Sequence, residues 1–121
     1  MPTEYTQLVA ALKALTQGEA PNKITLPMAE DDWNTRPETV SYGIVSLDFE
    51  ADALRGDNIK VATAYEGSVD LYTHGQAWLT AAAVETVLET YCGGAWDIQS
   101  IQYERETGLV HREYVFQIEV L

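Results

Sequence analysis

The segment from Val110 to Val120 alternates apolar and polar side chains more regularly than any other part of the chain. Strict alternation puts one set of side chains on each face of a β-strand, so the pattern is typical of a sheet with one face buried and one face in water. The inward set is predicted to be Tyr114, Phe116, Ile118 and Val120, and the outward set Glu113, Gln117 and Glu119. Such a strand constrains the fold strongly, because its sheet needs a layer of other elements to cover the apolar face.

The residues before this strand predict a helix and a second strand. Trp96 to Glu104 is expected to form a hairpin with Val110–Val120 through a turn at Glu106-Thr-Gly108. Gln76 to Tyr91 has apolar residues at helical spacing, and Gly93-Gly94 is expected to end this helix. The inner stripe of the helix is predicted to be Ala77, Ala81, Val84, Leu88 and Tyr91.

Two strands are predicted earlier in the chain. Val40 to Phe49 alternates, but its apolar phase slips as a bulge after Gly43 would produce. Ile59 to Thr73 alternates again, and Asp52 to Asn58 reads as the turn that joins the two strands into an antiparallel hairpin. The second strand is expected to place Tyr65, Gly67, Val69 and Leu71 on one face.

Thr3 to Gln17 predicts the first helix, with Thr3 as its cap and Gly18 as the left-handed residue that ends it. Its buried stripe is expected to be Tyr5, Leu8, Val9, Leu12 and Leu15. The predicted order is therefore helix, strand, strand, helix, strand, strand. This indicates an α+β fold: a mainly antiparallel sheet of four strands or slightly more, with both helices packed on one face.

Length and composition favour one compact domain over residues 1–121. Hydrophobic residues make up 46%, and no apolar run approaches the roughly 20 residues that cross a bilayer, so membrane insertion is not expected. The start, Met-Pro-Thr-Glu-Tyr, lacks the basic and apolar parts of a secretory signal, which predicts a chain kept in the cytoplasm.

The segment from Glu19 to Thr39 has no clear periodicity and contains three prolines, so it is predicted to be a long connection with room for a short strand at Lys23 to Met28. Connections of this length in small domains are often functional or become ordered on assembly. The stretch Glu30-Asp31-Asp32-Trp33 puts an aromatic side chain beside three carboxylates. Trp33 is a candidate anchor for a partner surface.

Seven basic and 19 acidic residues give a net charge of -12, which disfavours nucleic-acid binding through phosphate contacts. Two interpretations of this acidity stay open. The charge can serve only to keep the protein soluble, or it can line a channel where DNA slides without sticking.

No set of side chains in the sequence predicts chemistry. His74 and His111 lack a recognisable nucleophile or ligand set, and Cys92 has no partner for a disulfide or a structural zinc site. Asp48, Glu50, Asp52 and Asp57 are spaced like a calcium loop, but Ala53 and Ile59 stand where that loop needs Gly and Glu. A carboxylate pair from Asp70 or Glu66 has no identifiable pocket, and phosphate-binding and hydrolase motifs do not occur. We therefore expect no catalytic, metal or cofactor site, and a protein that is not an enzyme.

Several segments together resemble a known family. These are Tyr-Gly-Ile-Val-Ser-Leu-Asp, the turn Gly-Asp-Asn, Ser-Val-Asp-Leu-Tyr-Thr, a helix, and the closing hairpin Tyr-Glu-x-Glu-Thr-Gly-Leu-x-His-x-x-Tyr-x-Phe. In this order they are similar to the tail terminator, or tail-completion, proteins of long-tailed bacteriophages. The resemblance covers residues 1–121 in the order of elements.

The resemblance implies a virion structural protein that forms a ring, commonly of six subunits, on the head-proximal end of the tail tube. Such a ring stops tail polymerisation and joins the head–tail connector, and DNA passes through it without specific binding. Its place is the virion, after assembly in the host cytoplasm. The family brings no catalytic residues. Candidate interface residues are Glu30, Asp31, Asp32, Trp33, Arg36, Arg55 and Asp57.

Closed rings need contacts between unlike surfaces of neighbouring copies. Free sheet edges along Val40–Phe49 or Ile59–Thr73, together with the connection from Glu19 to Thr39, are predicted to supply them. Two alternatives remain open at this point. One is a head-completion or neck protein of the head–tail junction, and the other is a soluble non-viral binding module or small enzyme.

Overall fold

The computed structural model describes residues 3–56 and 59–120, with the backbone alone for residues 49–56 and 59–63. Helix α1 (Thr3–Lys13) is followed by three short strands, β1 (Thr16–Gln17), β2 (Ile24–Thr25) and β3 (Met28–Glu30). A long hairpin of β4 (Tyr42–Gly56) and β5 (Ile59–His74) comes next, then helix α2 (Trp78–Cys92) and the hairpin of β6 (Trp96–Glu104) and β7 (Leu109–Val120). The α+β class is confirmed.

The main sheet has five strands in the order β3-β4-β5-β7-β6. All neighbours are antiparallel except β3, which pairs in parallel with β4 from Met28↔Gly43 to Glu30↔Val45. The sheet is thus mixed and larger than the predicted four strands, because part of the connection between α1 and β4 adds an edge strand. Strands β1 and β2 form a separate two-stranded sheet.

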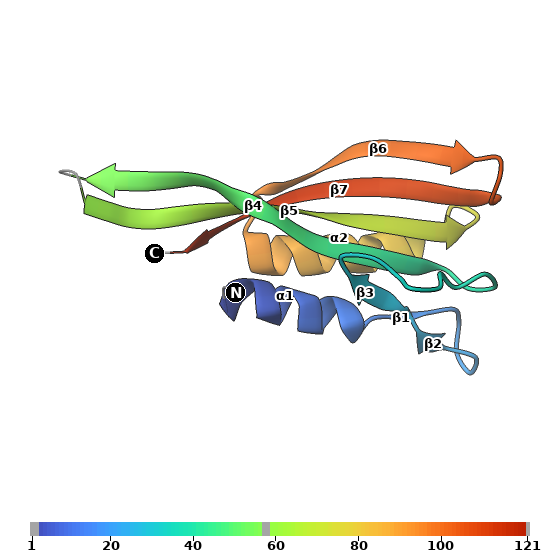
Figure 1. The fold of residues 1–121 in the computed structure, drawn as a ribbon. Helices are drawn as coiled ribbons and strands as arrows, with labels where there is room; N and C mark the ends of the chain where they lie inside the picture. The colour runs from blue at the N-terminus through green and yellow to red at the C-terminus, as the bar shows by residue number, and fades with distance from the viewer. Residues whose placement is uncertain (1–2, 57–58, 121) are drawn as a thin grey trace.

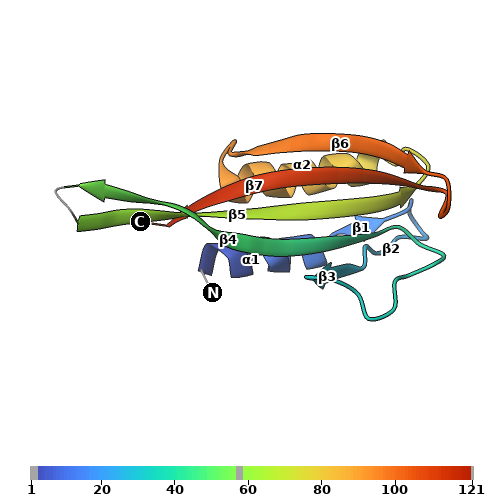
Figure 2. The same cartoon turned by 45° about the horizontal axis from the view of Figure 1, so that its top comes forward.

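Both helices lie side by side on one face of the main sheet, as Figures 1 and 2 show. The apolar stripe of α1 and the inner face of α2 pack on the central strands, which confirms the predicted layering. The buried members of this core include Tyr5, Leu8, Leu12, Val45, Val69, Leu71, Val84, Leu88, Tyr114, Phe116 and Ile118. Leu15 and Val120 are partly buried against the same core.

Helix α1 is shorter than predicted. It ends at Lys13, since Thr16 and Gln17 pair instead with Thr25 and Ile24 of β2. Gly18 has a positive φ of 86°, as predicted, but it uses this conformation after β1 and not at the helix end.

Helix α2 confirms most of its predicted inner stripe, since Ala81, Val84 and Leu88 are buried, together with Val87. Ala77 and Tyr91 are the exceptions. Ala77 is the N-cap before the first helical residue, and Tyr91 is 39% exposed, because the helical repeat brings Cys92 rather than Tyr91 against the core. Gly93 ends the helix with a φ of 57° and an N–H that donates to the carbonyl oxygen of Glu89 at 3.1 Å. The predicted glycine stop is therefore confirmed.

Strand β4 departs from the prediction in two ways. Its register shifts lie at Leu47/Phe49, Glu50/Asp52 and Leu54/Arg55, whereas Gly43 pairs regularly. The predicted bulge after Gly43 is wrong; the missing side chain there leaves room for Met28, whose Cε would lie 2.6 Å from an added Cβ. The predicted turn over Asp52–Asn58 is also too long, because β4 continues to Gly56.

Candidate assembly interfaces

The β4–β5 hairpin extends past the rest of the sheet. Pairing of β4 with β5 continues to Gly56↔Ile59, but pairing of β5 with β7 stops at Thr63↔Val120. We call residues 54–56 and 59–62 the hairpin arm. Figures 1 and 2 show it projecting from the body of the molecule as a two-stranded ribbon. A ribbon of two strands is only marginally stable in water by itself, so a contact with another molecule would stabilise it.

Both edges of the main sheet offer backbone groups for pairing. On one side, β3 covers β4 only from Gly43 to Val45, and in the pairings of residues 3–56 and 59–120 the remainder of β4 has no second strand beside it. On the other side, β6 is the outermost strand over all nine of its residues. Unpaired strand edges of this length are templates for pairing with a second chain.

Large apolar side chains are exposed next to the β6 edge. Ile101 is 50% exposed and Tyr103 is 66% exposed, and their cross-strand partners are Arg112 and Val110. Trp78, at the start of α2, is 66% exposed. Its ring lies over the buried guanidinium of Arg112, and the guanidinium carbon Cζ is 5.1 Å from the ring centroid. We call Trp78, Ile101 and Tyr103 the edge patch. Apolar groups beside a free edge favour a protein partner over solvent.

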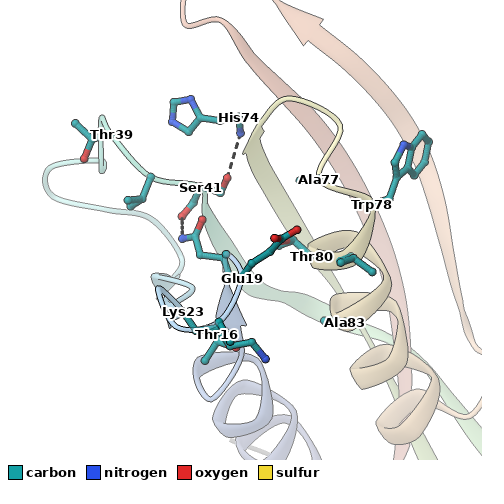
Figure 3. A pocket seen from close by; sticks show the side chains of 15 residues that line it. Thr16, Glu19, Lys23, Thr39, Ser41, His74, Ala77, Trp78, Thr80 and Ala83 are labelled. Atoms are coloured by element: carbon teal, nitrogen blue, oxygen red, sulfur yellow. Dashed lines mark hydrogen bonds between the residues drawn. The ribbon is translucent and has the colours of Figure 1, made fainter.

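An open groove of about 970 Å³ separates the β1–β2 region from the start of α2 (Figure 3). Gln17 Nε2 donates to the carbonyl oxygen of Ser41 at 2.8 Å, and the backbone N–H of His74 donates to Ser41 Oγ at 3.1 Å. Trp78 and Thr80 line the α2 side. The groove therefore runs from β1 to Trp78, the one member of the edge patch that lines it, and its lining is both apolar and polar.

The second face of the sheet is partly covered by the segment between β3 and β4. Tyr42 stacks on Tyr72 at a centroid distance of 5.0 Å, and Tyr72 stacks on His111 at 4.2 Å. Trp33 meets the edge of Tyr42 at 6.4 Å. The side chain of His111 is only 17% exposed in this stack. Cross-strand pairing puts the rings of Tyr42, Tyr72 and His111 in one row, which the sequence alone did not predict.

The predicted interface residues around Trp33 hold their own segment on this face. Trp33 Nε1 donates to the carbonyl oxygen of Gly43 at 3.1 Å, and Arg36 forms an ion pair with Asp32 at 3.3 Å. The Arg36 guanidinium also lies 5.4 Å from the centroid of Tyr72. The structure thus brings Asp32, Trp33 and Arg36 together.

The other predicted interface residues lie elsewhere. Glu30 ends β3 and pairs with Lys13 of α1 at 3.3 Å. Asp31 is exposed, has a positive φ of 67°, and donates its backbone N–H to the carbonyl oxygen of Val45 at 2.9 Å. Arg55 belongs by its backbone to the hairpin arm, and Asp57 lies outside the described residues. Among the predicted residues with described side chains, Glu30 is thus held by α1, whereas Asp32 is held by Arg36.

Titratable groups outside these edges show the effect of burial. Burial raises the pKa of the Cys92 thiol to about 11, so this thiol stays protonated at neutral pH and is a poor nucleophile. Burial, with nearby carboxylates, raises the pKa of Tyr5 to about 12. Burial and a hydrogen bond to Glu85 also raise the pKa of Tyr114.

One group of ionisable residues was missed by the sequence reasoning. Asp70, His111 and Glu113 each direct a potential ligand atom to one place, with these atoms within 4.8 Å of one another. Asp70 is 41 residues away from His111. Only the β5–β7 register, which pairs Asp70 with Glu113 and Tyr72 with His111, brings the group together.

Comparisons with protein-family models and with curated protein sequences return no match. Among the residues that the structure describes, no helix is long and apolar enough to span a membrane.

Proposed function

We propose that this chain is a virion structural protein that forms a ring on the head-proximal end of a phage tail tube. The ring stops tube growth and presents the surface that joins the head–tail connector. Its partners are further copies of itself, commonly six, the tail tube protein and the connector protein. DNA passes through the ring without specific binding, and the subunit acts by surface fit without making or breaking covalent bonds.

The observation that carries this proposal is the hairpin arm beside two free sheet edges. The arm and the β4 edge lie at one side of the sheet, and the β6 edge with its edge patch lies at the other. One copy therefore carries two unlike surfaces, and contact between unlike surfaces of successive copies closes into a ring when the rotation is right. Strand addition supplies backbone hydrogen bonds, and the edge patch supplies apolar area.

The charge of the chain supports the same proposal. A net charge of -12 repels the DNA backbone, so a ring of such subunits gives a passage in which DNA does not stick. The resemblance of the element order to tail terminators agrees with this role. The placement of acidic residues around a passage is part of the proposal.

The test is to remove the hairpin arm and keep the sheet. Replacing residues 54–62 by Asn-Gly joins Ala53 directly to Thr63, two residues that pair across β4 and β5, through a two-residue turn. The matched control shortens the opposite end in the same way, with Asn-Gly in place of residues 105–108 between the paired Glu104 and Leu109. We expect both variants to unfold cooperatively on heating, since both keep every residue of the described core.

Wild type and control are expected to cap purified tail tubes in negative-stain electron microscopy and to stop tube polymerisation. The arm variant is expected to lose at least tenfold in capping. Capping by a folded arm variant at the wild-type level would disprove the role of the arm. Binding of the ring to isolated heads but not to tubes would favour the alternative, a head-completion or neck protein.

The groove in Figure 3 is the observation that favours a soluble binding module. A groove of about 970 Å³ is large enough for a small molecule or a peptide end. Native mass spectrometry of the purified chain separates the two functions, because a small molecule retained with the protein supports the module and its absence beside ring-sized species supports the terminator.

A further inference from the structure

The group formed by Asp70, His111 and Glu113 lies on the sheet face opposite the helices, beside the stacked rings of Tyr42 and Tyr72. Asp70 and Glu113 are direct cross-strand partners. Like charges in this position repel and destabilise a sheet unless something compensates them. Glu104 adds a third carboxylate, with its Oε2 3.8 Å from His111 Nδ1. Arg36 sits over the ring of Tyr72 and forms its ion pair with Asp32, not with Asp70 or Glu113.

The geometry fits a metal ion. His111 Nε2 and Asp70 Oδ1 share a hydrogen bond of 2.8 Å, which an ion would replace, and the ligand atoms of all three residues lie within 4.8 Å of one another. Two ligands bound about 2.1 Å from one ion are about 3.0–3.4 Å apart for octahedral or tetrahedral angles. Small rotations of the two carboxylates therefore suffice to place three ligands on one ion.

The imidazole is oriented in the way that metal-binding histidines usually are. Tyr72 stacks on its ring at 4.2 Å with an interplanar angle of 12°, which fixes the plane of the ring. Glu104 Oε2 lies 3.8 Å from Nδ1, which is longer than a hydrogen bond, so a small movement of Glu104 is needed to make it the carboxylate partner that a ligating histidine commonly has on its second nitrogen. The ligands stand on the paired strands β5 and β7, which hold them more rigidly than loops would.

We infer that Asp70, His111 and Glu113 bind one divalent transition-metal ion of the Zn²⁺ type, with Glu104 as the residue that orients His111. One imidazole nitrogen with two carboxylate oxygens favours Zn²⁺ over Mg²⁺, which prefers oxygen ligands alone and keeps its water. Three protein ligands leave at least one position for water or for a group from a partner. The ion relieves the repulsion between Asp70 and Glu113 and ties β5 to β7. This inference does not depend on the proposed function.

The test uses the full chain after treatment with a chelator, titrated with ZnCl₂ in a calorimeter. We expect one equivalent to bind and the midpoint of thermal unfolding to rise. Asp70→Asn and Glu113→Gln keep the side-chain shape and remove a ligand charge, so each is expected to weaken binding at least tenfold. Glu119→Gln is the matched control, since it removes the same charge six residues along β7, about 20 Å away. Its affinity is expected to stay within about twofold of wild type.

A second measurement locates the ion. The chain has two histidines, so the imidazole nitrogen resonances in NMR spectra can be assigned with a His74→Gln variant. Zn²⁺ is expected to shift the resonances of His111 and to leave those of His74 in place, whereas MgCl₂ at the same concentration moves neither. Wild-type affinity in both Asp70→Asn and Glu113→Gln, a shift confined to His74, or no saturable binding would overturn the inference. If one of the two variants fails to fold, the other decides.

Discussion

Gly67 is the residue whose replacement the packing opposes most directly. A Cβ at this position would contact the ring of Phe116 and would lie 2.5 Å from the backbone carbonyl oxygen of Ser46. The ring is buried and the carbonyl belongs to the neighbouring strand, so neither can move freely. We expect Gly67→Ala to lower the free energy of unfolding by about 1–3 kcal/mol in urea titrations.

Gly43→Ala is the matched control for this prediction. Its Cβ would meet mainly the flexible end of Met28, with Cε at 2.6 Å and Sδ at 2.9 Å. Because a methionine end can rotate away, the expected cost is below about 1 kcal/mol. An equal loss of stability in the two variants would show that contact with Phe116 and Ser46 does not determine the cost of Gly67→Ala.

Two buried tyrosines make the fold sensitive to alkaline pH. The pKa of Tyr5 is raised to about 12 and that of Tyr114 is also raised, mainly by burial. The folded state therefore keeps these protons above pH 10, where an unfolded chain releases them. The stabilisation is complete below about pH 10 and is lost as the pH rises through about 12.

We expect the midpoint of urea unfolding to fall steeply over this alkaline range, together with the rise of tyrosinate absorbance. Tyr5→Phe removes one titrating group and is expected to flatten the fall. Tyr103→Phe serves as the control, because the side chain of Tyr103 is 66% exposed and does not belong to the core. A slope unchanged by Tyr5→Phe would contradict the role of burial.

At the scale of the element, α2 begins in an unusual conformation. Its N-cap residue Ala77 has φ 47° and ψ 52°, in the left-handed region, and makes no side-chain capping hydrogen bond. An alanine in this region is strained, and glycine is not. We expect Ala77→Gly to raise the free energy of unfolding by about 0.5–1 kcal/mol.

The matched control is Ala82→Gly on the exposed face of the same helix, away from its ends. Here glycine is expected to lower stability by about 1 kcal/mol, since it loses backbone entropy without relief of strain. The two variants thus differ in sign in thermal or urea unfolding. A loss of stability in both would mean that Ala77 is not strained in solution.

At the scale of the whole molecule, the net charge of -12 opposes the approach of one copy to another. Salt screens this repulsion, with a Debye length of about 10 Å at 0.1 M and about 3 Å at 1 M. If copies assemble through strand edges and the edge patch, the fraction of oligomer is expected to rise with NaCl in sedimentation velocity. Ile101→Lys, which puts a charge in the edge patch, is expected to reduce it at every salt concentration.

The matched control is Gln117→Lys, an exposed position on β7 with the same added charge. This variant is expected to assemble at least as well as wild type, because it lowers the net negative charge without touching the β6 edge. An oligomer fraction that falls with salt would indicate that ion pairs, rather than apolar and backbone contacts, hold the copies together.

The sequence by itself determined the local periodicities and their stops. Strand β6 from Trp96 to Glu104, the glycine that ends α2, and most of the buried stripes depend on residues close together in the chain, so alternation and helical spacing predict them. Tertiary structure decided what depends on distant pairing. It placed β3 beside β4 and paired β1 with β2 where α1 was expected to end. It also placed Gly43 in regular pairing with β5, where a bulge was expected.

The same distinction holds for the candidate sites. The sequence indicates that Trp33 and its acidic neighbours are unusual. Only the folded structure shows that Trp33 lies against Tyr42 and that Arg36 lies over Tyr72. Free edges and the ligand group of His111 exist only once strand order and register are fixed. Register is a long-range property, because it depends on which apolar faces are buried together. The sequence of a single strand therefore does not specify the strand that pairs with it.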